Sequence, residues 1–104
     1  MYSEKKLASL ICHEEIIMEG LDKDFWRLIK LVSPQRWEHI DETKELYSWV
    51  LALIGDHCIY FDSEKNVYVI AQFDDYWEIN TEKGVYESLH QLITDIVRSR
   101  FKRP

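Results

Sequence analysis

One short turn constrains the fold of this chain more than any other feature: Gly55-Asp56 lies between two apolar runs. The runs, Trp49–Ile54 and His57–Phe61, have the length and the β-branched and aromatic content of strands. A two-residue loop that begins with glycine suits a type II′ turn, because glycine adopts the positive φ of the first loop position at no steric cost. The pattern predicts an antiparallel hairpin.

A second turn extends this hairpin into a meander. The polar residues 62–66 separate the hairpin from a third strand at 67–73. The run 50–54 is apolar at every position, which predicts a central strand covered on both faces. Gln35–Ile40 is expected to add a strand beside it, and Tyr76–Ile79 a short strand at the far edge.

Helical periodicity precedes the strands. Near the N-terminus, apolar residues recur at helical spacing between a capping serine and a terminating glycine. These residues are Ser3, Leu7, Leu10, Ile11, Ile17, Met18 and Gly20. Residues 22–32 form a second helical stripe behind Asp22 as the cap, although 26–32 would also suit an extended segment; we favour helix. Ser33-Pro34 then interrupts the chain, because proline biases the residue before it away from helix.

A closing amphipathic helix is predicted for residues 85–101. Its apolar stripe consists of Tyr86, Leu89, Leu92, Ile93, Ile96 and Val97. The chain of 104 residues has room for one core. We therefore predict a single α+β domain over residues 1–104, in which an antiparallel β-meander of three to five strands packs against an N-terminal helical segment and the C-terminal amphipathic helix.

Charge is distributed unevenly along the chain. The formal net charge is −6. The last seven residues carry four basic side chains, Arg98, Arg100, Lys102 and Arg103, and no acid. Residues 1–97 therefore hold 9 basic (13 − 4) and 19 acidic side chains, which gives them a net charge of −10. An acidic body repels phosphate, so nucleic acid is not an expected partner. The basic end suits the C-terminus of a helix, whose dipole favours cations, with contact to nucleic acid or an acidic protein as the alternative.

The same sequence features predict a cytoplasmic protein with no membrane partner. The apolar runs are too short to cross a bilayer, and the N-terminal apolar stretch is broken by His13, Glu14 and Glu15, unlike a signal peptide. Cys12 and Cys58 are too few for a disulfide scaffold, and both lie among apolar neighbours. We expect two reduced, buried thiols.

The usual catalytic and metal-binding patterns are missing from the sequence. Two Cys-His pairs, Cys12-His13 and His57-Cys58, are neighbours in sequence. Because neighbouring side chains in a strand point to opposite faces, neither pair makes a catalytic dyad by itself. A pairing of Cys58 with His13 across the fold stays open. Position 17 is isoleucine rather than the second histidine of a zinc-protease helix, and three glycines supply no phosphate loop. The expectation is no catalytic residue, no metal and no cofactor.

A protein-binding surface is the remaining candidate site. Residues 74–78 combine two aromatic side chains with three carboxylates, the composition of a protein-binding hot spot. Carboxylates in the two hairpin turns would extend this acidic field if both turns lie on the same side. The candidate residues are Asp74, Asp75, Tyr76, Trp77, Glu78, Asp56, Asp62 and Glu64. The alternative is that the two aromatic rings only cover one end of the core and the acids are solvated.

The order of elements from Trp49 onward resembles a known group of proteins. An apolar strand, the Gly-Asp turn, the strand Ile-Tyr-Phe-Asp (59–62), the strand Tyr-Val-Ile-Ala (68–71), an aromatic edge and a closing helix follow one another. This order is similar to the C-terminal half of small bacterial immunity proteins of the SUKH type. The resemblance covers about residues 46–97 and lies in the order of elements, so it assigns no functional residue. It implies a protein that binds and blocks a cognate toxin, often a nuclease.

Three hypotheses of function follow. The first is a non-enzymatic binding protein, most concretely an immunity-type inhibitor that occludes the active site of a basic, nuclease-like toxin. The second is a small regulatory or scaffold domain, phage-encoded or dimeric, that uses a sheet edge or a helix. The third is an enzyme with an unrecognised thiol or carboxylate site.

Overall fold

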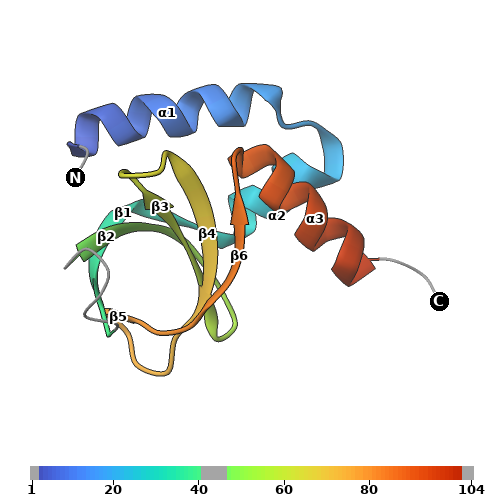
Figure 1. Cartoon of the computed structure of the whole chain (residues 1–104). Helices are drawn as coiled ribbons and strands as arrows, with labels where there is room; N and C mark the ends of the chain where they lie inside the picture. The colour runs from blue at the N-terminus through green and yellow to red at the C-terminus, as the bar shows by residue number, and fades with distance from the viewer. Residues whose placement is uncertain (1–2, 41–46, 102–104) are drawn as a thin grey trace.

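The computed structural model describes residues 3–40 and 47–101, and Figure 1 shows their arrangement. Within these residues, three helices and six strands form the predicted α+β fold. Their order is α1 (Glu4–Ile17), α2 (Gly20–Ile29), β1 (Lys30–His39), β2 (Tyr47–Ile54), β3 (His57–Asp62), β4 (Val67–Gln72), β5 (Glu78–Ile79), β6 (Glu82–Tyr86) and α3 (Leu89–Phe101). None of the helices in these ranges is long and apolar enough to cross a membrane.

The strands form one sheet in the order β5-β1-β2-β3-β4-β6. All neighbours are antiparallel except β5, which runs parallel to β1. The predicted hairpin joins β2 to β3, with Ile54 opposite His57 and Gly55 at a φ of 57°. The predicted meander of β2, β3 and β4 is confirmed, and the sheet has one strand more than the upper end of the predicted range.

Each face of the sheet contributes to a separate apolar core. On one face, residues such as Leu51, Ile59 and Phe61 pack against side chains of the three helices, including Leu7, Trp26 and Leu92. The second core contains no helix residue; its members are Trp37, Val50, Cys58, Tyr60, Val69, Ala71, Phe73 and Ile79. The sheet therefore curls to cover its own second face, as Figure 1 shows. The prediction that 50–54 is covered on both faces is confirmed.

Polar contacts fasten α3 to the first two helices. The Ser88 hydroxyl accepts a hydrogen bond from Gln91 N at 3.0 Å, and the Glu14 carboxylate of α1 accepts one from His90 N at 3.0 Å. Two backbone N–H groups in the first turn of α3, which have no acceptor within the helix, are therefore hydrogen-bonded. Asp22 was predicted to cap the second helix, but the N-cap is Glu19 and makes no side-chain bond. Asp22 instead accepts from the Thr94 hydroxyl at 2.7 Å.

The first half of the chain differs from prediction mainly at its boundaries. α1 ends at Ile17, before the predicted stop at Gly20, and Gly20 opens α2 with a φ of 56°. Residues 22–29 are helical as favoured, whereas 30–32 already belong to β1. Pro34 is tolerated in that strand because it lies where the β1–β2 register shifts, between Lys30 and Gln35.

Two predictions about the second half are wrong. The short strand at 76–79 was placed at the far edge, but β5 lies at the opposite edge, beside β1. The place beside β4 is taken by β6, whose Tyr86 and Val85 were predicted to begin the closing helix. Tyr86 precedes Leu89 by three residues and so imitates helical spacing, yet Ser88 caps a helix that begins only at Leu89.

One cysteine is also placed differently from the prediction. Cys58 is buried as expected, but Cys12 is exposed on α1, the helix whose buried residue is Leu7. Of the basic residues near the C-terminus, Arg98 is exposed in the second half of α3 and Arg100 belongs to the same helix. Lys102 and Arg103 lie outside the described residues.

Candidate protein-binding surface

The loop that contains the predicted site follows β4 and returns to the sheet as β5. Gln72 and the pair Asn80-Thr81 close its base: Gln72 N donates to Thr81 O at 2.8 Å, and Asn80 N donates to Gln72 O at 2.9 Å. Inside the loop, Asn80 Nδ2 donates to Asp74 Oδ2 at 3.0 Å. Residues 74–78 are thus held on a closed loop between two strands, and all five are exposed.

An aromatic cluster anchors this loop to the core. Trp37, at 1% exposure, packs edge-on against Phe73 with ring centroids 5.1 Å apart. Tyr76 and Trp77 contact the same indole, at 6.2 and 6.0 Å between centroids, but remain 66% and 55% exposed. Two large rings are therefore held by a buried tryptophan while most of their surface faces solvent, which is typical of an interface anchor.

The backbone of Trp77 is strained. Its φ is 78°, a region that bulky residues rarely adopt and that costs about 1–3 kcal/mol. The strain is maintained by pairing with β1, because Glu38 N donates to Trp77 O at 2.8 Å. Strained residues of this kind cluster at functional sites, so the position of Trp77 favours the interface over the alternative that it merely covers the core.

Asp74, Asp75 and Glu78 surround the two rings with negative charge. Among the residues that the structure describes, none of these three carboxylates forms an ion pair. Asp56 joins the same end of the sheet, since its carbonyl accepts from Phe73 N at 2.8 Å. We call Asp56 and residues 74–78 the aromatic-acidic surface.

Asp62 and Glu64 are not part of this surface. Asp62 ends β3, opposite Val67, whereas the turn with Asp56 precedes the first residue of β3. The two hairpin turns therefore lie at opposite ends of one strand, and the condition that both turns share a side is not met. Asp62 has a local role: its carboxylate accepts from the amides of Glu64 and Lys65 at 3.0 and 3.3 Å.

The Cys58 thiol does not meet the requirements of a catalytic nucleophile. Cys58 lies in the second core, and burial raises the pKa of its thiol to about 12, so the reactive thiolate is disfavoured. Cys12 and His13 lie on exposed positions of α1. Among the described residues, no group of three or more His, Cys, Asp or Glu side chains could hold a metal ion.

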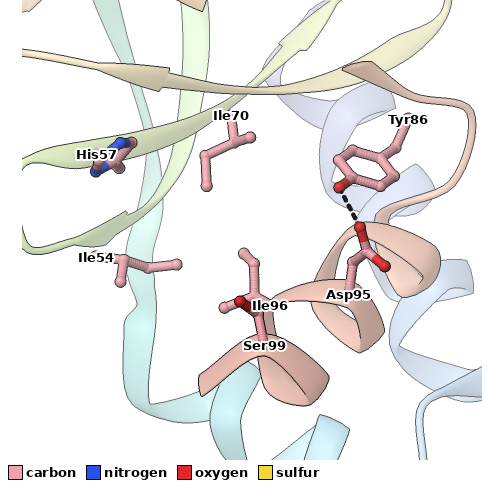
Figure 2. Close-up of a pocket in the computed structure, with 7 residues that line it drawn as sticks. All are labelled: Ile54, His57, Ile70, Tyr86, Asp95, Ile96 and Ser99. Atoms are coloured by element: carbon pink, nitrogen blue, oxygen red, sulfur yellow. Dashed lines mark hydrogen bonds between the residues drawn. The ribbon is translucent and has the colours of Figure 1, made fainter. Parts of the chain in front are cut away.

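A shallow hollow of about 270 Å³ lies between the sheet and α3, and Figure 2 shows its lining. Tyr86 Oη donates to Asp95 Oδ2 at 2.6 Å, and this bond, with partial burial, raises the pKa of the tyrosine. His57 stands across the hollow, with Nδ1 2.7 Å from Asp56 Oδ1. The apolar side chains of Ile70 and Ile96 lie between these polar groups. No hydrogen bond between the described residues joins His57 to Ser99, so these two residues do not form a nucleophile–base pair.

Sequence reasoning identified the exposed part of the aromatic-acidic surface but missed its anchor. Trp37 was seen only as part of a strand at 35–40, and the parallel pairing of β5 that brings residues 77–79 beside Glu38 and His39 had no sequence signal. No protein-family model matches the chain, and comparisons with curated proteins and with solved structures likewise give no match.

Proposed function

We propose that this chain is a non-enzymatic binding domain that recognises a basic protein through the aromatic-acidic surface. One observation carries the proposal: Tyr76 and Trp77 are mostly exposed although both contact the buried Trp37. Aromatic anchors that are already positioned lose little conformational entropy on binding. The surrounding carboxylates would attract a basic partner and accelerate encounter.

The most concrete form of this function is an immunity-type inhibitor. A nuclease toxin has a basic cleft for phosphate, and the aromatic-acidic surface would occlude that cleft by charge and shape. Such an inhibitor needs no catalytic group. The resemblance of the element order predicted from residues 46–97 to immunity proteins of the SUKH type supports this proposal.

Co-expression tests the inhibitor proposal. The gene beside this one is expected to encode a toxin whose lethality is relieved by this protein, and the two proteins should form a complex at moderate salt. Growth that is not restored, together with no complex in a pull-down, would contradict the proposal. Tyr76→Ala with Trp77→Ala should lose rescue, whereas Ile17→Ala with Leu21→Ala, two exposed apolar residues outside this surface, should retain it.

A second candidate, a regulatory or scaffold domain that dimerises, is favoured by the edge strand β6, which among the described residues pairs only with β4. β6 is the last strand in the order, and its Val85 is exposed. Edge strands with exposed apolar side chains invite pairing with another chain. Light scattering of the purified protein alone would give twice the monomer mass if this candidate is correct, and the monomer mass if it is not.

A further inference from the structure

A second surface, unlike the first in charge, lies between α1, α2 and the start of β1. Two adjoining hollows of about 280 and 160 Å³ are open there and share Glu15, Trp26 and Lys30 in their linings. We call the two hollows the α1–α2 groove. Figure 1 places α1 on the side of the molecule away from β5, so the groove is separate from the aromatic-acidic surface.

The carboxylate in the groove, that of Glu15, already accepts two hydrogen bonds. Glu15 Oε2 accepts from Trp26 Nε1 and from Lys30 Nζ, both at 2.7 Å. Partial burial opposes ionisation of Glu15, but the bonds from Lys30 and Trp26 outweigh it and lower the pKa of the carboxyl. Glu15 is therefore ionised at neutral pH and bonded to Lys30, and the charge of the nearby Arg27 also favours its ionised form.

Two further cations line the groove beside Lys30. Lys23 and Arg27 line the larger hollow, and neither forms an ion pair with any residue that the structure describes. The larger hollow thus holds three basic side chains against the one carboxylate of Glu15. This local excess of positive charge lies on a chain whose net charge is −6.

Apolar side chains flank the same cations. Ile16 lines the larger hollow and Val32 the smaller one, with exposures of 70% and 106%. Leu28, next to Arg27 on α2, is 83% exposed. A cluster of large, solvent-exposed apolar side chains around a surface hollow is typical of an interaction site. Cations flanked by apolar side chains fit an occupant with carboxylates beside an apolar stripe.

A second copy of the chain does not fit this groove through two-fold symmetry. In a two-fold dimer centred on this groove the same patch faces itself, so the positive excess of one copy would face an equal positive excess on the other. That arrangement brings like charges together in a partly desolvated interface, which is unfavourable. Phosphate alone would satisfy the cations but leave the apolar side chains uncovered.

We infer that the α1–α2 groove binds an acidic, amphipathic peptide segment of another protein, with apolar side chains in the two hollows and carboxylates on Lys23 and Arg27. Helix-in-groove recognition uses apolar anchors spaced along one face in this way. The inference does not depend on the proposed inhibitor function, because it uses different residues and a partner of opposite charge.

Cys12 provides a direct readout of occupancy. It lines the larger hollow and is exposed, whereas Cys58 is buried, so uncharged iodoacetamide should modify Cys12 first. The probe is a synthetic helical peptide of about 14 residues with a leucine stripe flanked by glutamates. Mass spectrometry of the intact protein should show that the peptide slows Cys12 modification in a saturable manner. The matched control is the same peptide with lysine in place of every glutamate, which should give no protection.

Charge reversal in the groove supplies the second arm of the test. Lys23→Glu with Arg27→Glu should weaken protection by at least about tenfold in Kd. The control is Lys65→Glu with Lys83→Glu, which changes the net charge equally at exposed positions outside the groove and should leave Kd unchanged. Lys23→Gln with Arg27→Gln, a milder change, repeats the test if the reversed variant is not folded.

Several outcomes would overturn the inference. These are no protection at millimolar peptide, equal protection by the lysine peptide, or unchanged Kd in both groove variants. Protection that rises with protein concentration in the absence of peptide would assign the groove to a second copy. Equal protection by decanoate would assign it to small apolar carboxylates instead of a peptide.

Discussion

Trp77 combines a large exposed ring with a backbone conformation that suits glycine, at a φ of 78°. This combination allows its strain to be measured separately from its side chain. Alanine and glycine at position 77 both remove the ring, but only glycine adopts positive φ without a steric cost. We expect Trp77→Gly to be more stable than Trp77→Ala by about 1 kcal/mol, measured by urea unfolding. Equal stability of the two variants would show that the loop relaxes away from positive φ.

Glu15 has a structural role that depends on its charge. Glu15→Ala leaves the indole N–H of the buried Trp26 without its acceptor, so we expect a loss of about 1–3 kcal/mol in the free energy of unfolding. Glu15→Gln keeps an acceptor for Trp26 but loses the charged bond to Lys30, and we expect a smaller loss, because that ion pair is partly solvated.

The pH dependence of this contribution follows from the direction of the pKa shift. The pKa of Glu15 is lower in the folded state than in the unfolded state, so its stabilisation is complete above the unfolded value and disappears as pH falls through the folded value. The difference in unfolding free energy between the wild type and Glu15→Gln should therefore be largest near pH 7 and shrink below about pH 4. A difference that does not change with pH would contradict the assigned ionised state.

At the scale of elements, the start of α3 depends on Ser88, the N-cap residue that lies between the end of β6 and the first residue of the helix. Ser88 accepts from Gln91 N, and loss of a serine N-cap costs about 1 kcal/mol. Ser88→Ala should lower the unfolding free energy by this amount, and Ser88→Asp should restore most of it. Thermal unfolding followed by circular dichroism checks both variants, with Ser9→Ala on the exposed face of α1 as the control. No loss in Ser88→Ala would mean that Glu14 alone satisfies the helix terminus.

The elements that sequence predicts well are those with local signals. The Gly55 turn, the apolar run 50–54 and the period of α1 and α3 each depend on neighbours in sequence, and the structure confirms all four elements. β5 and β6 depend on distant partners instead. β5 is held by Glu38 and Ile40, and β6 by pairing with β4, so neither carries a pattern of its own. Tyr86 was misread because a residue at the end of a strand can have helical spacing to the next helix.

The aromatic-acidic surface was also predictable only in its local features. Residues 74–78 were recognisable from composition, but the burial of Trp37 beneath them and the positive φ of Trp77 required the curled sheet. The inclusion of Asp62 and Glu64 was wrong for a topological reason: successive hairpin turns lie at opposite ends of the strand that they share.

At the scale of the whole molecule, two surfaces of opposite charge lie on different parts of the fold. The aromatic-acidic surface consists of a loop and a turn at one end of the sheet, and the α1–α2 groove consists of helices and the start of β1. Each combines exposed apolar side chains with charged side chains that form no ion pair with a described residue: Asp74, Asp75 and Glu78 in the first, and Lys23 and Arg27 in the second. The two proposals use different residues, so we expect binding at one surface to leave the residues of the other exposed.

Recognition of a basic protein through the aromatic-acidic surface is tested most directly by reversing the charge of that surface and measuring the affinity for the partner. Asp74→Lys, Asp75→Lys and Glu78→Lys together should weaken binding by about a hundredfold or more, mainly through slower association. The matched control reverses Glu4, Glu64 and Glu87, which are exposed elsewhere and change the net charge equally. Surface plasmon resonance at moderate salt measures both rates. We expect a large loss of affinity for the first variant and a small loss for the control; equal affinities of the two variants would contradict binding through the aromatic-acidic surface.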